Sequence, residues 1–176
     1  THWKCTSSCF VLTLRNQLSA FSYQQRAESK LQKAESFLYL CKMVKIGNIE
    51  LPDFPFLLAP MEDVSDPPFR RLCKLHGADL MYSEFISSEG LIRDAMKSRK
   101  KLDIFDYERP VGIQIFGGDE EAMSLSAKIV ETVNPDIVDI NFGCPVKKVV
   151  SKGAGAGVLK DVDLMVRLTK AVVNST

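Results

Sequence analysis

The fold is decided by residues 110–141, which read PVGIQIFGGDEEAMSLSAKIVETVNPDIVDIN. The stretch opens with an apolar run at 110–115 and closes with a second one at 136–141. Between the two runs, residues 119–133 form a helical segment. Its candidate inward side chains are Met123, Ile129, Val130 and Val133. Short apolar runs separated by a helix are typical of a unit with parallel strands.

The same alternation of strand and helix continues on both sides of this stretch. Apolar runs at 56–59 and 78–82 come before it. Further helices are expected at 65–76, 88–101 and 161–173. The first of them has a clear start and end, because Ser65 and Asp66 precede two prolines and Gly77 closes the segment.

The spacing of the strands indicates the architecture. Strands are expected to begin near residues 56, 79, 110 and 136. A (β/α)₈ barrel uses about thirty residues for each βα unit and ~250 residues in all. The part from Met43 to Thr176 corresponds to about half of this length. We predict an α/β fold, a (β/α)₈ TIM barrel of which only about the first four βα units are present.

Composition narrows the classes of function. The chain has 176 residues, and a hydrophobic content of 45% is enough for a real core. With 23 basic against 22 acidic side chains, bulk charge does not indicate a nucleic-acid binder, so any RNA contact must come from local basic loops. No apolar run is long enough to span a membrane, and we expect no membrane partner. Five cysteines, an odd number without paired spacing, predict reduced thiols and a cytoplasmic protein.

Residues 1–42 differ from the rest of the chain. They are rich in Ser, Gln and Lys and carry six basic but only two acidic side chains. We expect an N-terminal extension that is poorly ordered or helical, with a transit peptide and a genuine accessory helix as alternatives. Cys5 and Cys9 lie close to His2, but no second Cys/His pair follows, so we expect no metal site.

Candidate site residues follow the expected strands, because active sites of parallel α/β folds form at the carboxyl ends of strands. After the first strand, Pro60, Met61 and Glu62 would lie at the mouth of the barrel, although a tight turn explains them equally well. On the third strand, Gln114 stands between two isoleucines. A buried amide without partners costs ~1–3 kcal/mol, so Gln114 requires a ligand or a turn to bond with.

The loop after the fourth strand carries the most reactive group. Asn141 closes the strand, and Cys144 follows on a loop held by Pro145. A thiol at this position can act as a nucleophile or as a general acid. The only histidines are His2 and His76, which argues against a Cys–His hydrolase and favours proton donation by the neutral thiol. The alternative is a buried structural cysteine.

Glycines and lysines follow Cys144 in the stretch 147–157, which reads KKVVSKGAGAG. It does not fit the G-x-G-x-x-G pattern of dinucleotide-binding folds. Three lysines among glycines predict a mobile loop that meets a phosphate backbone, or else a solvated loop tip.

These segments together resemble one family. The motifs are Ala59-Pro60-Met61 with Asp66-x-Pro68-Phe69-Arg70, Gln114-Ile115-Phe116-Gly117, Asp139-Ile140-Asn141-Phe142-Gly143-Cys144-Pro145-Val146-Lys147-Lys148-Val149 and Gly153-Ala154-Gly155-Ala156-Gly157. In composition and order they resemble the tRNA-dihydrouridine synthases, in particular the bacterial B-type. The resemblance covers about residues 43–176.

The resemblance implies an FMN-dependent enzyme that uses NADPH to reduce uridine to 5,6-dihydrouridine in tRNA. It assigns protonation of uracil C5 to Cys144 and flavin contacts to Pro60, Met61, Glu62, Gln114 and Asn141. The family's second-half flavin contacts, its phosphate-binding loops and its helical tRNA-binding domain have no counterpart in this sequence, so we expect a truncated chain. We therefore expect an isolated chain to associate with itself through open sheet edges. Two alternatives stay open: an inactive fragment, and an FMN barrel that acts on a free pyrimidine, as in dihydroorotate-type oxidoreductases.

Overall fold

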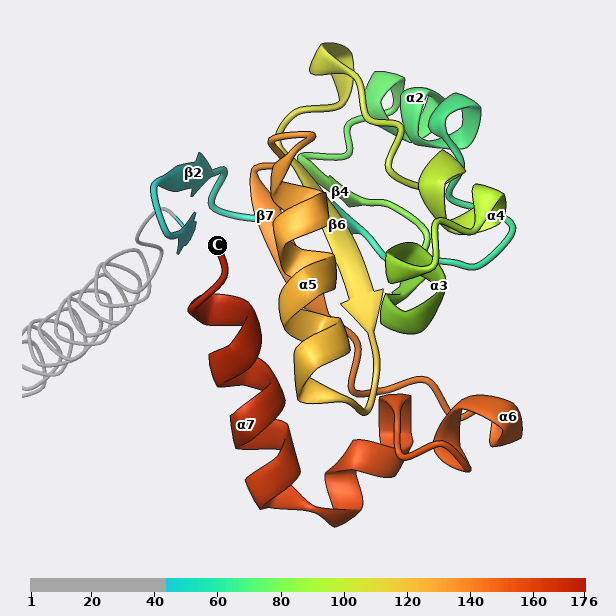
Figure 1. Cartoon of the computed structure of the whole chain (residues 1–176). Helices are drawn as coiled ribbons and strands as arrows, with labels where there is room; N and C mark the ends of the chain where they lie inside the picture. The colour runs from blue at the N-terminus through green and yellow to red at the C-terminus, as the bar shows by residue number, and fades with distance from the viewer. Residues whose placement is uncertain (1–43) are drawn as a thin grey trace, which may run out of the picture. The chain divides into compact units, whose positions relative to one another are not determined.

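The computed structural model describes residues 44–176 (Figure 1). The expectations for residues 1–42, including the extension and the Cys5/Cys9 site, lie outside the described residues. The described part opens with a two-stranded sheet formed by β1 (Val44–Ile46) and β2 (Ile49–Leu51). Sequence analysis did not predict this pair.

A parallel sheet forms the centre of the molecule, as predicted. Its main strands are β3 (Leu57–Leu58), β4 (Leu80–Tyr82), β6 (Val111–Phe116) and β7 (Ile137–Ile140). They lie in the order β3-β4-β6-β7, and each pair is parallel. A short strand, β5 (Ile86–Ser87), pairs with the end of β6 beyond β4. The four expected strand starts are therefore confirmed to within a residue or two.

Helices follow the strands and complete four βα units. The long ones are α2 (Pro67–Leu75), α5 (Glu120–Glu131) and α7 (Val162–Val173). Each is capped at its N-terminus by an aspartate side chain that accepts a backbone N–H, as Asp66 does from Phe69. The alternation supports the predicted fold class of partial barrel units.

Two local predictions were wrong. The helix expected at 88–101 is divided into α3 (Ser88–Ile92) and α4 (Met96–Lys100), because Asp94 takes a left-handed backbone with φ of 57° and interrupts the hydrogen-bonding pattern. The lysine stretch predicted as a loop begins with a short helix, α6 (Lys147–Val150), and continues into the 3₁₀ helix η2 (Gly155–Lys160).

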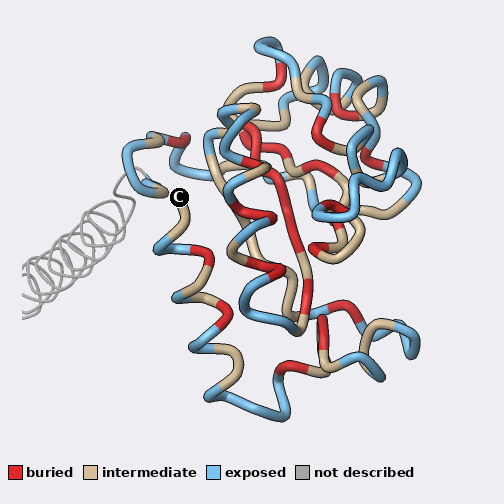
Figure 2. Tube along the Cα trace, viewed as in Figure 1, coloured by how far each residue is buried: buried red, intermediate tan, exposed pale blue. Residues whose placement is uncertain are grey.

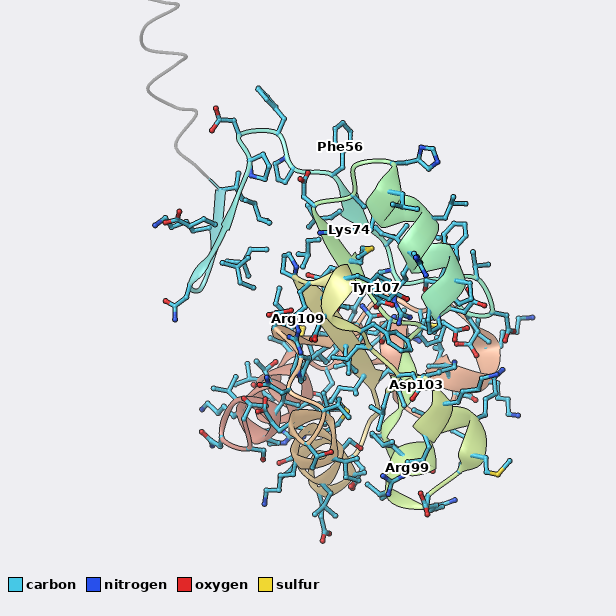
Figure 3. The ribbon with its side chains drawn as sticks, turned by 90° about the horizontal axis from the view of Figure 1, so that it is seen from above. Phe56, Lys74, Arg99, Asp103, Tyr107 and Arg109 are labelled. Atoms are coloured by element: carbon cyan, nitrogen blue, oxygen red, sulfur yellow. The ribbon has the colours of Figure 1, made fainter. Side chains whose placement is uncertain are left out.

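Helix α2 is fixed to the rest of the chain by a buried ion pair. Arg70 donates to both carboxylate oxygens of Glu108, at 2.7 and 3.3 Å, and neither side chain is more than 2% exposed. Glu108 lies in the 3₁₀ helix η1 (Asp106–Glu108). Two carbonyls, those of Ser65 and Asp103, accept two further N–H groups of Arg70 at 2.7 Å. Figure 3 labels Asp103 on the segment that passes beside α2.

The hydrophobic core lies between the sheet and helices α5 and α7. Strand β6 runs through its middle and is the long buried segment in Figure 2. Alternate residues of β6, Ile113 and Ile115, face the helices together with Val138 and Ile140 of β7. From α5, the core receives Met123, Ala127 and Val130, so two of the four predicted inward residues are fully buried, and Ile129 and Val133 pack against the core.

The opposite face of the sheet carries polar groups. Because side chains alternate along a strand, Gly112, Gln114 and Asp139 point away from the helices. We call this side the inner face, since in a closed barrel it would face the axis. Strand β7 pairs with β6 alone among the described strands, so its other edge is open.

No helix of the described part is long and apolar enough to cross a bilayer.

Candidate active site

The predicted site residues come from three strands, and most of them follow the carboxyl end of a strand. Pro60, Met61 and Glu62 follow β3, Gln114 lies within β6, and Asn141 and Cys144 follow β7. All three strands are parallel members of one sheet, so their carboxyl ends lie at the same edge.

Cys144 is held through its backbone. Asn141 accepts the N–H groups of both Gly143 and Cys144 on its side-chain Oδ1, at 3.0 and 2.8 Å. This turn, in which a side chain replaces a backbone carbonyl, is typical of asparagine. The carbonyl of Cys144 in turn accepts the N–H of Ala156 at 3.0 Å. The cysteine is 8% exposed and is a free thiol.

The amide of Gln114 is satisfied by two neighbouring side chains. Its Nε2 donates to Asp139 Oδ2, and its Oε1 accepts from Asn141 Nδ2 at 2.8 Å. The prediction that this buried amide needs partners is confirmed, and protein side chains supply them rather than a turn. The hydrogen bonds form one chain from Asp139 through Gln114 and Asn141 to the backbone of Cys144. The thiol loop is thereby tied to the inner face.

Tyr82 completes the inner face beside this chain of hydrogen bonds. It pairs in register with Gly112, and its ring carbons lie 2.5 Å from where a Cβ on Gly112 would stand. Glycine is required there because the ring occupies that space. Burial raises the pKa of the Tyr82 hydroxyl, and the negative charge of Asp139 raises it further. The phenol is therefore neutral over the physiological range.

The residues after β3 do not join this chain of hydrogen bonds but make contacts of their own. The backbone of Met61 is tied to the buried Ser65 hydroxyl by two contacts of 2.9 Å. The Glu62 carboxylate pairs with Lys101 and, at 3.2 Å, with Lys97. The Glu62 carboxylate thus lies against two lysine ammonium groups.

A cavity of about 590 Å³ lies next to Cys144. Of the predicted residues, Glu62 and Cys144 line it, whereas Pro60, Met61, Gln114 and Asn141 do not. Its walls also come from segments that sequence analysis did not single out as site residues, above all β5, α4 and the loop after β6. The residues concerned are Phe85, Ile86, Ser87, Ser88, Glu89, Lys97, Ser98, Lys101, Phe116, Gly117, Gly118 and Asp119. The one feature of the sequence that could have pointed to α4 as part of the site is its lysines, which stand at helical spacing up to residue 101.

Four lysines line this cavity in two distinct states. Lys97 bonds to Asp63 at 3.1 Å and to Glu62, and these hydrogen bonds raise the pKa of its ammonium group, that of Asp63 most. Lys101 is also paired, through Glu62. Lys148 and Lys152 are exposed, and no carboxylate within residues 44–176 pairs with either of them. Two exposed lysines without a carboxylate partner in this part of the chain therefore line the same cavity as Cys144.

The described residues contain no cluster of potential metal ligands. In the described part of the chain, no three His, Cys, Asp or Glu side chains lie together in a way that could hold an ion.

Comparison with known proteins identifies the family. A family model described as dihydrouridine synthase matches residues 57–176. A probable tRNA-dihydrouridine synthase of Rickettsia prowazekii is 40% identical over 134 residues, which is 76% of this chain and 41% of the relative. The tRNA-dihydrouridine synthase B of Pseudomonas aeruginosa is 38% identical over 133 residues, 76% of this chain and 40% of the relative. The chain thus spans about two fifths of the length of these relatives.

The match covers all four βα units, the inner face and the Cys144 loop. The resemblance stated from the sequence motifs is therefore confirmed. On these grounds the chain belongs to the dihydrouridine synthase family.

Proposed function

We propose that this chain forms part of an enzyme that reduces uridine to 5,6-dihydrouridine in tRNA, with FMN as cofactor and NADPH as reductant. The observation that carries the proposal is the thiol of Cys144, which is held beside a cavity at the carboxyl edge of the sheet. Relatives that share about 40% identity with this chain are named for the same reaction. The free thiols of Cys73 and Cys144 suit the cytoplasm as its location.

The free hydrogen-bonding groups of the inner face support the flavin assignment. An amide side chain has two N–H donors and two oxygen lone pairs. After bonding to Asp139 and Asn141, Gln114 keeps one donor and one lone pair, and Asn141 keeps one N–H. These groups match the carbonyls and ring nitrogens at the edge of an isoalloxazine. We assign Gln114 and Asn141 to this edge, with Pro60, Met61 and Glu62 beside it. When bound, FMN would supply the hydride for C6 of the uracil.

Cys144 then acts as the proton donor. Hydride addition at C6 leaves negative charge spread over C5 and the neighbouring carbonyl. A neutral thiol near C5 gives up its proton to that carbon and becomes a thiolate, which takes a proton from solvent afterwards. Asn141 fixes the backbone of Cys144, and so limits how far the thiol can move from the substrate.

The free cations suit an RNA substrate. Phosphate contacts of RNA-binding proteins come mainly from Lys and Arg and determine where the nucleic acid lies. Lys148 and Lys152 are exposed at the cavity. We propose that they contact the tRNA backbone on either side of the target uridine.

The test is Cys144→Ala in the complete gene product that carries this sequence. We expect bound FMN to be unchanged and dihydrouridine formation to fall by about 10²–10⁴, the range for a lost general acid. Dihydrouridine is quantified in the tRNA by mass spectrometry. Cys73→Ala is the matched control, because Cys73 is the other free cysteine described and lies on α2. Wild-type activity in Cys144→Ala would refute the assignment.

A further inference from the structure

Gly155 lies closer to Cys144 than any other residue type could. It opens η2 within the glycine-rich stretch, is buried, and has a left-handed backbone with φ of +53°. A Cβ added to it would lie 2.8 Å from the Cys144 carbonyl oxygen and 3.0 Å from the Cys144 Cβ. Neither atom is the end of a flexible side chain, so the cysteine itself would have to move.

The backbone of the next residue, Ala156, holds the same turn against Cys144. The N–H of Ala156 donates to the Cys144 carbonyl at 3.0 Å. This hydrogen bond requires the 155–156 turn to lie directly against residue 144. On the other side, Asn141 accepts the N–H of Cys144 at 2.8 Å. The main chain of the cysteine is therefore held between β7 and η2, and the absence of a side chain at Gly155 lets η2 close on it.

We propose that Gly155 is a positioning residue that holds the Cys144 thiol at the cavity. Within the stretch 147–157, Gly155 then supports the cysteine, while the phosphate contacts are those proposed for Lys148 and Lys152. The proposal rests on the proposed function in so far as Cys144 is the proton donor. Proton transfer requires hydrogen-bond reach, and a displacement of about 1 Å can lower a rate ~100-fold.

The chain contains a matched control for this contact. Gly153 also has a left-handed backbone, with φ of +69°, but a Cβ added there would meet nothing within 4 Å. Alanine at either position carries the strain of a left-handed conformation. Only alanine at position 155 would also collide with Cys144. The difference between the two variants thus isolates the contact.

The experiment compares Gly155→Ala with Gly153→Ala in the complete gene product. We expect Gly155→Ala to lower kcat about 10- to 100-fold with KM for tRNA within about twofold, and Gly153→Ala to keep kcat within about twofold. The melting temperature should fall in both variants, and further in Gly155→Ala because only that alanine also collides with Cys144. The rate of Cys144 alkylation by iodoacetamide, read from its peptide by mass spectrometry, should change at least threefold in Gly155→Ala only. Cys73 alkylation serves as the internal reference.

A second variant keeps the test informative if Gly155→Ala folds poorly. The added Cβ would also lie 3.0 Å from Val149 Cγ1, so Val149→Ala gives the turn room to move away from Cys144. The double variant Val149→Ala/Gly155→Ala should recover part of kcat and the wild-type alkylation rate. Equal effects of the two glycine variants, or no recovery in the double variant, would overturn the proposal. Alkylation does not depend on catalysis, so it tests the contact even if Cys144→Ala were fully active and the proposed function failed.

Discussion

The position of Gln114 gives its side chain two roles. It is 7% exposed and joins Asp139 to Asn141, the residue that holds the Cys144 backbone. The same amide keeps one donor and one lone pair for a ligand. A change at Gln114 therefore affects both the proposed flavin contact and the loop that carries the thiol.

Replacement of Gln114 by leucine tests the proposed flavin contact. The variant keeps the bulk but removes, besides the bonds to Asp139 and Asn141, a hydrogen bond to the flavin of about 0.5–1.5 kcal/mol, so FMN affinity should fall about three- to tenfold. Flavin fluorescence titration of the complete gene product measures the dissociation constant. Ile113→Leu is the control, because Ile113 faces the helices on the same strand. Identical affinity in Gln114→Leu would place the flavin contact on another residue.

The need for partners around Gln114 was predictable from its sequence neighbours, but the identity of the partners was not. A glutamine between isoleucines on a buried strand has to bond to something. That it bonds to Asp139 depends on the register of β6 and β7, which pairs Gln114 with Asp139. The hydrophobic pattern of two parallel strands leaves such a register open. The lining of the cavity by β5 and α4 was missed for a similar reason, since it depends on tertiary packing.

At the scale of elements, the pairing of Arg70 with Glu108 determines where α2 lies. Both side chains are buried, and the guanidinium also bonds to two carbonyls (Figure 3 labels one of these residues, Asp103). Removal of one partner of such a pair leaves an uncompensated charge in the interior, which costs more than the pair itself contributes.

We expect Arg70→Met to lower the free energy of unfolding by about 3–5 kcal/mol. The double variant Arg70→Met/Glu108→Leu should lose markedly less, because no charge stays behind. Urea denaturation of the complete gene product, followed by circular dichroism, measures both. A loss below about 1 kcal/mol in the single variant would show that Glu108 is solvated or paired in another way.

Strands and long helices were predictable at this scale because each one has a clear physical signal. Buried strands are short apolar runs, and α2, α5 and α7 begin at an aspartate cap. The break between α3 and α4 has no such signal. It occurs at Asp94, an exposed residue, without glycine or proline, and its left-handed backbone is one that aspartate adopts only occasionally. Strand β5 has two residues, too few for any periodicity.

At the scale of the whole molecule, the open edge of β7 is the feature that favours association with other chains. Its outer edge has no strand partner in the described part, and its residues Ile137 and Ile140 are only half-buried. A second cavity, of about 520 Å³, lies along this edge between β7 and the end of α7. An apolar, unpaired strand is a template for association with another chain.

We predict that the isolated 176-residue chain forms dimers or larger assemblies and does not bind FMN stably. Leaving even about 400 Å² of apolar surface exposed forgoes ~10 kcal/mol, which is comparable to the stability of a domain. Light scattering after size-exclusion chromatography gives the mass. Ile137→Lys, at the open edge on the inner face, should reduce association, whereas Val166→Lys on the exposed side of α7 should not. A yellow monomer with a cooperative melt would contradict this prediction.

The contact between Arg70 and Glu108 also has a consequence for protein synthesis. The two residues are 38 positions apart in the chain. At about 5–20 residues per second, the ribosome adds Glu108 roughly 2–8 seconds after Arg70. During that interval α2 has its aspartate cap and the Ser65 carbonyl, but no carboxylate balances the charge of the Arg70 guanidinium. The first βα unit of the sheet therefore cannot dock in its final place during its own translation, and it has to wait for the segment that immediately precedes β6.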